Sequence, residues 1–331
     1  MKFEVSAVNE ELEELPQVFV CTASYEERCR SIADKLDTSN LKTAVVLWNS
    51  DYAGQAEGNI VALESKFDGK IKKVELKTDD PLSVADSLRE QVLPIIEECA
   101  GLCLIDVTTF THEQLLILVK LLAEAAPKAR IKFAYTGASE YSTNFQGEEK
   151  WLSKGVSSIR AVLGYPGVML PSKKLHLIVL IGFEAERAEK LISYSEPAML
   201  TLGIGRRKQS VTEEHHETNV IFHERVKAFS EEISTLLEGV HRFEFSAVDP
   251  VEAMKDILSE VGRSPEYNVA VCPLNTKPST IGAALAALKE DRIQLIYTQP
   301  VEYNVNGYSR PGTQFTLFDF NQLLSSLDNS D

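Results

Sequence analysis

The sequence carries an internal repeat, and this repeat restricts the possible folds more than any single motif does. Residues 135–144 read Tyr-Thr-Gly-Ala-Ser-Glu-Tyr-Ser-Thr-Asn, and residues 297–306 read Tyr-Thr-Gln-Pro-Val-Glu-Tyr-Asn-Val-Asn. Tyr, Thr, Glu, Tyr and Asn recur at the same five places, at an offset of 162 residues (297 − 135). This match predicts that the chain consists of two related halves.

Other pairs of segments match in the same order along the chain. The matched pairs are 19–28 with 178–187, 73–76 with 242–245, Asp80-Pro81 with Asp249-Pro250, and 105–109 with 272–276. The offset at the Asp-Pro pair is 169 residues (249 − 80), and it drifts by a few residues between pairs, as insertions and deletions in loops require. The alternative is that two Rossmann-like domains share the chemistry of their strand ends without duplication.

Each half reads as alternating strands and helices. In the first half, strands are expected at 18–22, 43–48, 71–77, 102–107 and 130–136, and helices at 25–36, 55–67, 81–99 and 112–125. In the second half, strands are expected near 176–181, 198–202, 242–247, 268–273 and 294–298. Apolar strands that alternate with helices predict an α/β fold, in which each parallel sheet is covered on both faces.

The expected strand order is the doubly wound 3-2-1-4-5. Two tandem Rossmann-like domains are therefore predicted, at 1–160 and 161–331, with residues 155–174 as the connection. Asp80 is placed to cap the helix that begins with Pro81. Residues 206–218 read as an exposed loop.

Composition and charge exclude several kinds of partner. The 331 residues carry a net charge of −15, and a protein that grips duplex nucleic acid needs a basic face. The longest apolar stretches, such as 175–183, are too short to span a membrane, and the N-terminus lacks the apolar run of a signal peptide. The five cysteines form no Cys-x-x-Cys pair, which indicates buried reduced thiols and a cytoplasmic location.

Ligands of doubly wound sheets bind beyond the carboxyl ends of the strands, between the first and fourth strands. Hydroxyls and free backbone amides at the start of a helix suit a phosphate or carboxylate. The candidates after the first strand of each half are Thr22, Ser24, Tyr25, Glu26 and Arg28, and Gly182, Phe183, Glu184 and Arg187. The alternative is that Ser24 only caps the helix, with Glu27 completing a capping box.

The turns after the fourth strands supply a second group of candidates. These are Asp106, Thr108, Thr109 and Phe110 in the first half, and Asn275, Thr276 and Lys277 in the second. Lys277 is a plausible anion ligand. The alternative for the first turn is structural, with Thr111 capping the next helix and Asp106 accepting from loop amides.

The repeated Tyr-Thr-x-x-x-Glu-Tyr segments follow the last strands. Their tyrosines and glutamates suit stacking of a base and bonding of its amino or ribose groups, or else they pin the loop at the sheet edge. The candidates are Tyr135, Glu140, Tyr141, Tyr297, Glu302 and Tyr303.

Several motifs of enzymes and cofactor sites are missing from the sequence. It contains no Gly-x-x-x-x-Gly-Lys-Ser/Thr loop, no full Gly-x-Gly-x-x-Gly and no Gly-x-Ser-x-Gly. We expect no cofactor. We also expect no metal at residues 213–217, Glu-Glu-His-His-Glu, because adjacent histidines point in different directions.

The turns Asp106-x-Thr108 and Asn275-x-Lys277, together with Thr22–Ser24, resemble the signature turns of CARF domains (CRISPR-associated Rossmann fold). The tandem arrangement resembles SAVED domains. The resemblance implies binding of a cyclic oligonucleotide messenger in bacterial antiviral defence, and slow cleavage of the ligand in some members. The sequence departs from the pattern at His112, where a Lys or Arg is expected, and at Pro273, which stands where the first half has Asp106.

Three functions therefore stay open. The first is a sensor of a small anionic nucleotide-type ligand that signals to a separate protein effector, or acts as a homo-oligomer. The second is an enzyme on a nucleotide or nucleoside (a phosphodiesterase, N-glycosidase or transferase), for which the candidate groups are Glu26, Asp106, Glu140, Lys277 and Glu302. The third is a structural subunit of a defence complex. For the sensor, we expect the turns of both halves to face one electropositive cleft, with Arg28, Arg187 and Lys277 supplying the charge.

Overall fold

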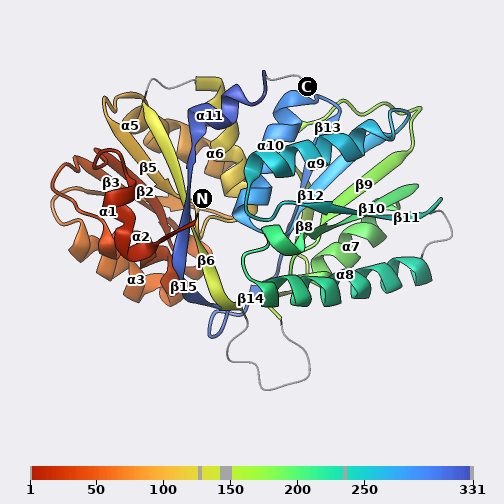
Figure 1. Ribbon diagram of the computed structural model, residues 1–331, viewed down its shortest axis with the longest axis horizontal. Coiled ribbons are helices and arrows are strands. Elements are labelled where there is room, and N and C mark those ends of the chain that lie inside the picture. The colour runs from red at the N-terminus through yellow and green to blue at the C-terminus, as the bar shows by residue number, and fades with distance from the viewer. Residues whose placement is uncertain (1, 126–128, 142–150, 234–236, 329–331) are drawn as a thin grey trace. The chain divides into compact units, whose positions relative to one another are not determined.

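The computed structural model describes residues 2–125, 129–141, 151–233 and 237–328 (Figure 1). The chain divides into two compact units. The first comprises residues 1–144 and 305–329, and the second comprises residues 145–304. Asn144, one of the repeated positions, lies outside the described residues.

The first unit is built on a seven-stranded sheet. Five of its strands are parallel and follow one another across the sheet as β4 (Ile71–Leu76), β3 (Thr43–Asn49), β2 (Val18–Ala23), β5 (Leu102–Asp106) and β6 (Arg130–Tyr141). This is the predicted order 3-2-1-4-5. Two antiparallel strands extend the sheet beyond β6, first β15 (Ser309–Asp319) and then β1 (Lys2–Glu4).

Most helices of the first unit lie where the sequence places them. The predicted regions contain α2 (Ser31–Lys35), α3 (Ala53–Lys66), α4 (Pro81–Ser87), α5 (Leu93–Glu97) and α6 (His112–Ala125), whereas α1 (Val8–Glu11) and α11 (Phe320–Ser325) were not predicted. The expected helix 25–36 is wrong in its first part, because residues 24–26 form a turn and Glu27–Arg30 a 3-10 turn. The expected helix 81–99 contains a π-helical stretch at Leu88–Val92, just before Pro94, which has no N–H to donate.

The second unit repeats the same sheet. Its parallel strands follow one another as β11 (Val240–Phe245), β10 (Met199–Gly205), β9 (Leu175–Leu180), β12 (Asn268–Pro273) and β13 (Ile293–Gln299), again in the order 3-2-1-4-5. The main helices are α7 (Ala185–Ser195), α8 (Glu213–Ile233), α9 (Pro250–Gly262) and α10 (Lys277–Lys289). The expected loop 206–218 is wrong from residue 213 onward, because α8 begins there.

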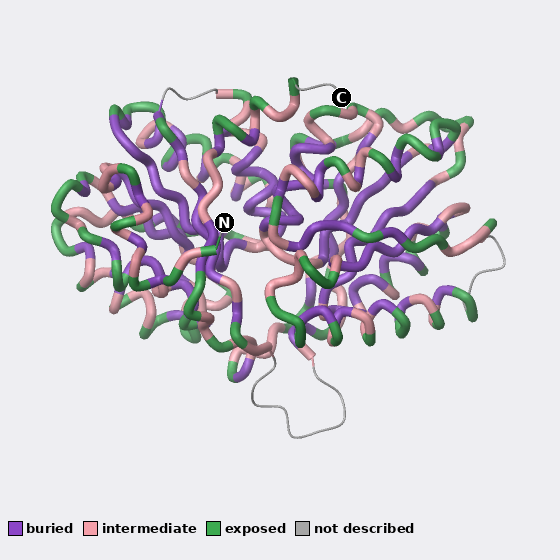
Figure 2. The backbone as a smooth tube through the Cα atoms, in the orientation of Figure 1, coloured by how far each residue is buried: buried purple, intermediate pink, exposed green. Residues whose placement is uncertain are grey.

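In the first unit the two central strands, β2 and β5, are buried along their whole length, as expected for a sheet covered on both faces (Figure 2). All six residues of β2 and all five of β5 are buried.

The matched Asp-Pro pairs play one role in both units. Asp80 accepts a hydrogen bond from the backbone N–H of Ser83, and Asp249 accepts from those of Val251 and Glu252, so each caps the helix that its proline begins.

The sixth strands are exchanged between the two halves of the sequence. β8 (Ser158–Pro166) follows β6 in the chain, but it pairs antiparallel with β13 of the second unit. β15 follows β13, but it pairs antiparallel with β6 of the first unit (Figure 1). The expectation that residues 155–174 only connect the halves is therefore wrong, and the units differ from the expected domains at 1–160 and 161–331.

Candidate functional site

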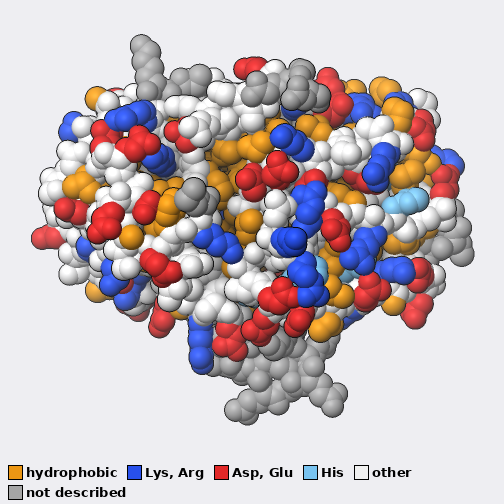
Figure 3. Space-filling view, in the orientation of Figure 1, with side chains coloured by type: hydrophobic (Ala, Val, Ile, Leu, Met, Phe, Trp, Pro, Cys, Tyr) orange, Lys and Arg blue, Asp and Glu red, His pale blue; other side chains and the backbone are white. Residues whose placement is uncertain are grey.

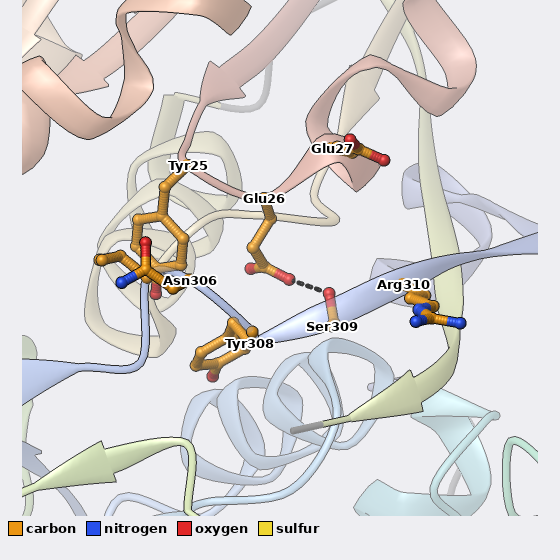
Figure 4. A pocket seen from close by; sticks show the side chains of 9 residues that line it. Tyr25, Glu26, Glu27, Asn306, Tyr308, Ser309 and Arg310 are labelled. Atoms are coloured by element: carbon orange, nitrogen blue, oxygen red, sulfur yellow. Dashed lines mark hydrogen bonds between the residues drawn. The ribbon is translucent and has the colours of Figure 1, made fainter. Parts of the chain in front are cut away.

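A pocket of about 330 Å3 lies in the first unit, at the carboxyl end of β2 (Figure 4). One wall is the turn after β2, with Tyr25, Glu26 and Glu27. The other wall is the segment that leads into β15, residues 305–310. β2 and β5 are the first and fourth strands, and the pocket is lined by the turn after β2 but by no residue of the turn after β5.

Local hydrogen bonds hold the turn that carries Tyr25 and Glu26. The Ser24 hydroxyl accepts from the backbone N–H of Glu26 at 3.3 Å, and the side-chain amide of Asn59 on α3 donates to the Ser24 carbonyl at 2.8 Å. Ser24 thus closes a turn instead of forming the capping box with Glu27 that the sequence suggested. The structural role of Asn59 could not be read from the sequence, because α3 lies 35 residues further along the chain.

Glu26 and Arg28 form a buried ion pair behind the pocket. The Glu26 Oε2 atom accepts from Arg28 Nη2 at 2.6 Å and from Nε at 3.0 Å. The Ser309 hydroxyl on β15 donates to the same oxygen at 2.6 Å (Figure 4). Arg28 Nη1 donates to the Thr136 carbonyl at 3.3 Å and to the Tyr141 hydroxyl at 3.4 Å.

Arg28 stays charged although it is buried. Burial alone lowers the pKa of Arg28, but Glu26 and the neighbouring tyrosines outweigh that effect and raise the pKa well above its ordinary value. The guanidinium carbon of Arg28 lies 5.3 Å from the centre of the Tyr141 ring, which adds a cation–π contact. Glu26 is thereby held in one position with its carboxylate facing β15.

Tyrosine rings gather around the pocket. The Tyr25 and Tyr308 rings are 5.8 Å apart at an angle of 69°, and the Tyr52 ring lies 5.8 Å from that of Tyr25. The ring of Tyr141 lies 6.2 Å from that of Tyr308. Tyr52 and Tyr308 were not among the predicted residues, because they lie outside the repeated segments.

The predicted residues around β5 are buried and bonded to each other. Asp106 Oδ1 accepts from the Thr108 hydroxyl at 2.5 Å and from the Thr108 backbone N–H at 3.0 Å. The Thr109 hydroxyl donates to the Thr22 carbonyl at 2.7 Å, which ties this turn to β2. Phe110 is 1% exposed. These bonds match the structural alternative, in which Asp106 accepts from loop amides.

Asp106 has a raised pKa, but its carboxyl group is not accessible from the pocket. Burial raises the pKa of Asp106 to about 7, while the two bonds from Thr108 and the charge of Arg28 oppose the rise. Its side chain is 1% exposed, and it does not line the pocket. A substrate in the pocket would meet Glu26 and Glu27 instead, so the geometry offers Asp106 no contact with a reacting atom.

In the second unit, the strand-end turns are closely packed. A Cβ atom on Gly182 would lie 1.8 Å from the Leu274 carbonyl oxygen, so only glycine fits between the two turns. The side-chain amides of Asn219 and Asn275 both donate to the Ile181 carbonyl, at 2.7 and 2.5 Å. Asn219 lies on α8, one residue beyond the expected exposed loop 206–218, and the sequence assigned it no element.

The predicted residues Thr276 and Lys277 begin α10. Thr276 caps this helix by accepting from the backbone N–H of Ser279, and its hydroxyl donates to the Ala247 carbonyl. Lys277 is half-buried at the first position of the helix. Phe183 packs its ring against those of His215 and Phe222.

The second unit has its own buried ion pair, between Glu184 and Arg187. Glu184 Oε2 accepts from Arg187 Nη1 at 2.7 Å, and Arg187 Nε donates to the Thr298 hydroxyl at 3.1 Å. The Ser153 hydroxyl donates to Glu184 Oε1 at 2.5 Å. The guanidinium carbon of Arg187 lies 5.3 Å from the centre of the Tyr297 ring.

The repeated tyrosine segments begin on the expected last strands, and their later tyrosines and glutamates also lie on strands. Tyr135 is buried on β6, and Glu140 and Tyr141 belong to the same strand, five residues beyond its expected end at 136. Glu302 and Tyr303 form β14, which pairs with β7 (Ser153–Lys154) in a two-residue ribbon. Glu302 is exposed, whereas Tyr303 is half-buried.

The histidines of 213–217 have other partners. His216 Nδ1 is hydrogen-bonded to the Gly205 carbonyl at 2.9 Å, and the His215 ring packs edge-on against Phe183. In the described parts of the chain, no group of three or more His, Cys, Asp or Glu side chains is arranged to hold a metal ion. Among the helices that the structure describes, none is both long and apolar enough to cross a bilayer.

The comparisons with known proteins assign the chain to no family. No protein-family model matches the chain, and no curated protein matches its sequence. Among solved structures, it is similar to a Delta-pyrroline-5-carboxylate dehydrogenase from Mycobacterium tuberculosis bound with NAD and cobalamin, at 11% identity and a TM-score of 0.22, over 92% of this chain and 64% of that one. It is also similar to the cytoplasmic domain of a prokaryotic cation chloride cotransporter, at 8% identity and a TM-score of 0.23, over 88% of this chain and 98% of that one.

A third similar structure is a C2-type ketoreductase from a modular polyketide synthase, at 15% identity and a TM-score of 0.20, over 75% of this chain and 66% of that one. The chain thus spans less than two thirds of the dehydrogenase. These TM-scores are too low for the likenesses to bear on function, so the functional argument rests on the geometry of the two units.

Proposed function

We propose that the chain is a sensor that binds a nucleotide-type ligand in the pocket of the first unit. The observation that carries this proposal is the convergence of Tyr25 and Tyr308 with Glu26 on one cavity at the carboxyl end of β2. The cavity, of about 330 Å3, falls within the usual range for small-molecule sites.

The chemistry of the lining suits a base and its sugar. Aromatic rings stack on any nucleobase, because every base has a π-face. The carboxylates of Glu26 and Glu27 accept hydrogen bonds from amino and hydroxyl groups, and the Asn306 side chain both donates and accepts. The rings of Tyr25 and Tyr308 contact each other, so we place the base and ribose against these rings, beside Glu26, and not between them.

The chain path favours a sensor over a simple binding protein. The pocket wall 305–310 begins just after β14 of the second unit and runs into β15 of the first. A ligand that prefers one position of this wall would act on the segment by which the chain returns from the second unit to the first. The role in antiviral defence and the separate effector rest on the resemblance of the strand-end turns alone.

Thermal unfolding in the presence of nucleosides, mononucleotides and cyclic oligonucleotides tests the proposal. A ligand at 100 times its Kd should stabilise the fold by about 2.7 kcal/mol. Changing Tyr308 to Ala should weaken binding of that ligand about tenfold or more, because a stacked base contributes about 1–3 kcal/mol.

The matched control is Tyr194→Ala, since Tyr194 is 72% exposed on α7 of the second unit. Equal affinity in the Tyr308 and Tyr194 variants, or no stabilisation by any nucleotide or nucleoside, would rule the pocket out as the binding site.

A further inference from the structure

One edge of the second sheet is formed by a regular strand. The strand order of this sheet ends at β11, which pairs with β10 and with no other strand of the described residues (Figure 1). Its register with β10 runs from Val240 to Phe245 without a shift. Proteins usually protect a sheet edge with a bulge, a proline or a lysine, because unpaired backbone groups attract another strand. β11 contains none of these three features.

The backbone of β11 presents hydrogen-bonding groups on its outer side. The carbonyl oxygens of Gly239, just before β11, and of Phe245, its last residue, accept from backbone N–H groups of β10 and of the residue after it. The direction of the backbone groups alternates along a strand. Those of Val240, Arg242 and Glu244 therefore point away from β10.

Two of these outward-facing positions carry opposite charges. The side chains of Arg242 and Glu244 are 50% and 53% exposed, and the closest approach between their charged atoms is 3.7 Å. This is too long for a hydrogen bond, and exposed pairs of this kind contribute little to stability. Phe243, which lies between them in the sequence, is buried. The outer side of β11 thus combines backbone donors and acceptors with one charge of each sign.

The equivalent edge strand of the first unit differs in what its cations contact. β4 has the same pattern of charges, with Lys73 and Glu75 at the matched positions. However, Lys73 Nζ lies 2.5 Å from a carboxylate oxygen of Glu64 on α3. The ammonium of Lys72 donates to the Gln91 carbonyl at 2.9 Å. The cations of β4 are therefore used within the first unit, which makes β11 the better candidate for an external contact.

The charges select one register for two copies of β11. In an antiparallel pair, outward-facing residues of one strand lie opposite outward-facing residues of the other. Centring the pair on Arg242 would place two arginines opposite each other, and centring it on Glu244 would oppose two glutamates, and both arrangements are unfavourable. Centring it on Phe243 places Arg242 of each copy opposite Glu244 of the other. This register satisfies the backbone groups and both charge pairs.

We propose that β11 is a docking surface for a second copy of this chain. The two β11 strands pair antiparallel about Phe243 and join two second-unit sheets into one. This surface does not depend on the pocket of the first unit. Since the contact centres on a single strand with exposed charges, we expect a reversible dimer that added salt weakens.

Sedimentation velocity of the full chain at low ionic strength, over a range of concentrations, tests the proposal. The wild-type protein should approach the mass of a dimer as its concentration rises. Arg242→Glu and Glu244→Arg should each weaken self-association about tenfold or more, because each variant places like charges opposite one another in both pairs. When the two variants are mixed in equal amounts, opposite charges face each other again, and the dimer should return.

Lys255→Glu is the matched control. Lys255 lies on α9 of the same unit, is 64% exposed and lies 3.6 Å from Glu252, so the variant makes the same change of charge in a similar exposed pair. It should dimerise like the wild-type protein. The proposal is overturned if the wild-type protein stays monomeric at every concentration, or if Arg242→Glu and Lys255→Glu associate alike. It is also overturned if the mixture of Arg242→Glu and Glu244→Arg associates as weakly as either variant alone.

Discussion

Replacing Asp106 with Asn should make the protein less sensitive to pH. Burial raises the pKa of Asp106 to about 7 from its ordinary value of 3.8, so the fold favours the neutral carboxyl. Below the ordinary pKa, the carboxyl is protonated in both the folded and unfolded states and ionisation carries no penalty. As the pH rises from the ordinary pKa through the folded-state pKa, the free-energy penalty of ionising the buried Asp106 develops in full, and the wild-type protein loses that amount of stability.

The two pKa values set the size of the effect. At about 1.4 kcal/mol for each tenfold difference in proton affinity, the penalty reaches about 4 kcal/mol above pH 8, of which about 2 kcal/mol develops between pH 5.5 and 8.5. The asparagine keeps an oxygen to accept from the two Thr108 donors, but it cannot ionise. Its unpaired amide adds a destabilisation that does not depend on pH. The test is therefore how the difference in unfolding free energy between the two proteins changes with pH.

The assay is urea unfolding of both proteins at several pH values in that range, above the isoelectric point near 5.0. The free energy of unfolding of wild type minus that of Asp106→Asn should fall by about 2 kcal/mol as pH rises from 5.5 to 8.5. Asp80→Asn is the control, because it makes the same chemical change at an exposed helix cap that asparagine also serves. A flat difference, or one that grows toward acid, would refute the reasoning.

Two further predictions concern the second unit, and the first of them has a control in α3. Gly182→Ala should destabilise the protein by about 3 kcal/mol or more in the same unfolding assay, because its Cβ would lie 1.8 Å from the Leu274 oxygen. Gly58→Ala, where a Cβ meets nothing within 4 Å in α3, should instead stabilise it by about 0.5–1 kcal/mol, and equal effects would contradict the close approach at residue 182. Elemental analysis of the purified protein should find no stoichiometric zinc, whereas a zinc ion that is lost on changing His215 and His216 would show that the prediction for 213–217 is wrong.

Charged side chains of both signs are interspersed on the face of the molecule in Figure 3, although the net charge is −15. The expected electropositive cleft between the halves stays a prediction. Arg28 and Arg187, two of its three expected cations, are each buried against a glutamate of the same unit. The positive charges of these arginines are therefore largely balanced by neighbouring glutamates, and this cannot be seen by counting charged residues in the sequence.

Much of the fold could be predicted because its causes are local. Apolar strands of five to seven residues that alternate with helices have few ways to bury both faces of a parallel sheet, so the order 3-2-1-4-5 followed for both units. The cap at Asp80 and the helix start at Pro81 depend only on neighbouring residues. The repeat also pointed to Arg28 and Arg187 as equivalent positions, whereas it aligns Glu26 with Ala185 and not with Glu184.

The pocket and the exchange of strands were decided by tertiary structure. β8 and β15 each had two possible partners, the fifth strand of either half, and alternation along the chain does not distinguish between them. Because β15 joined β6, Tyr308 and Ser309 came to face Tyr25 and Glu26, more than 280 residues away in the chain. The sequence by itself determined the five parallel strands of each sheet, but only long-range pairing decided which strands extend them and which residues form the site, since that pairing depends on the packing of the whole unit.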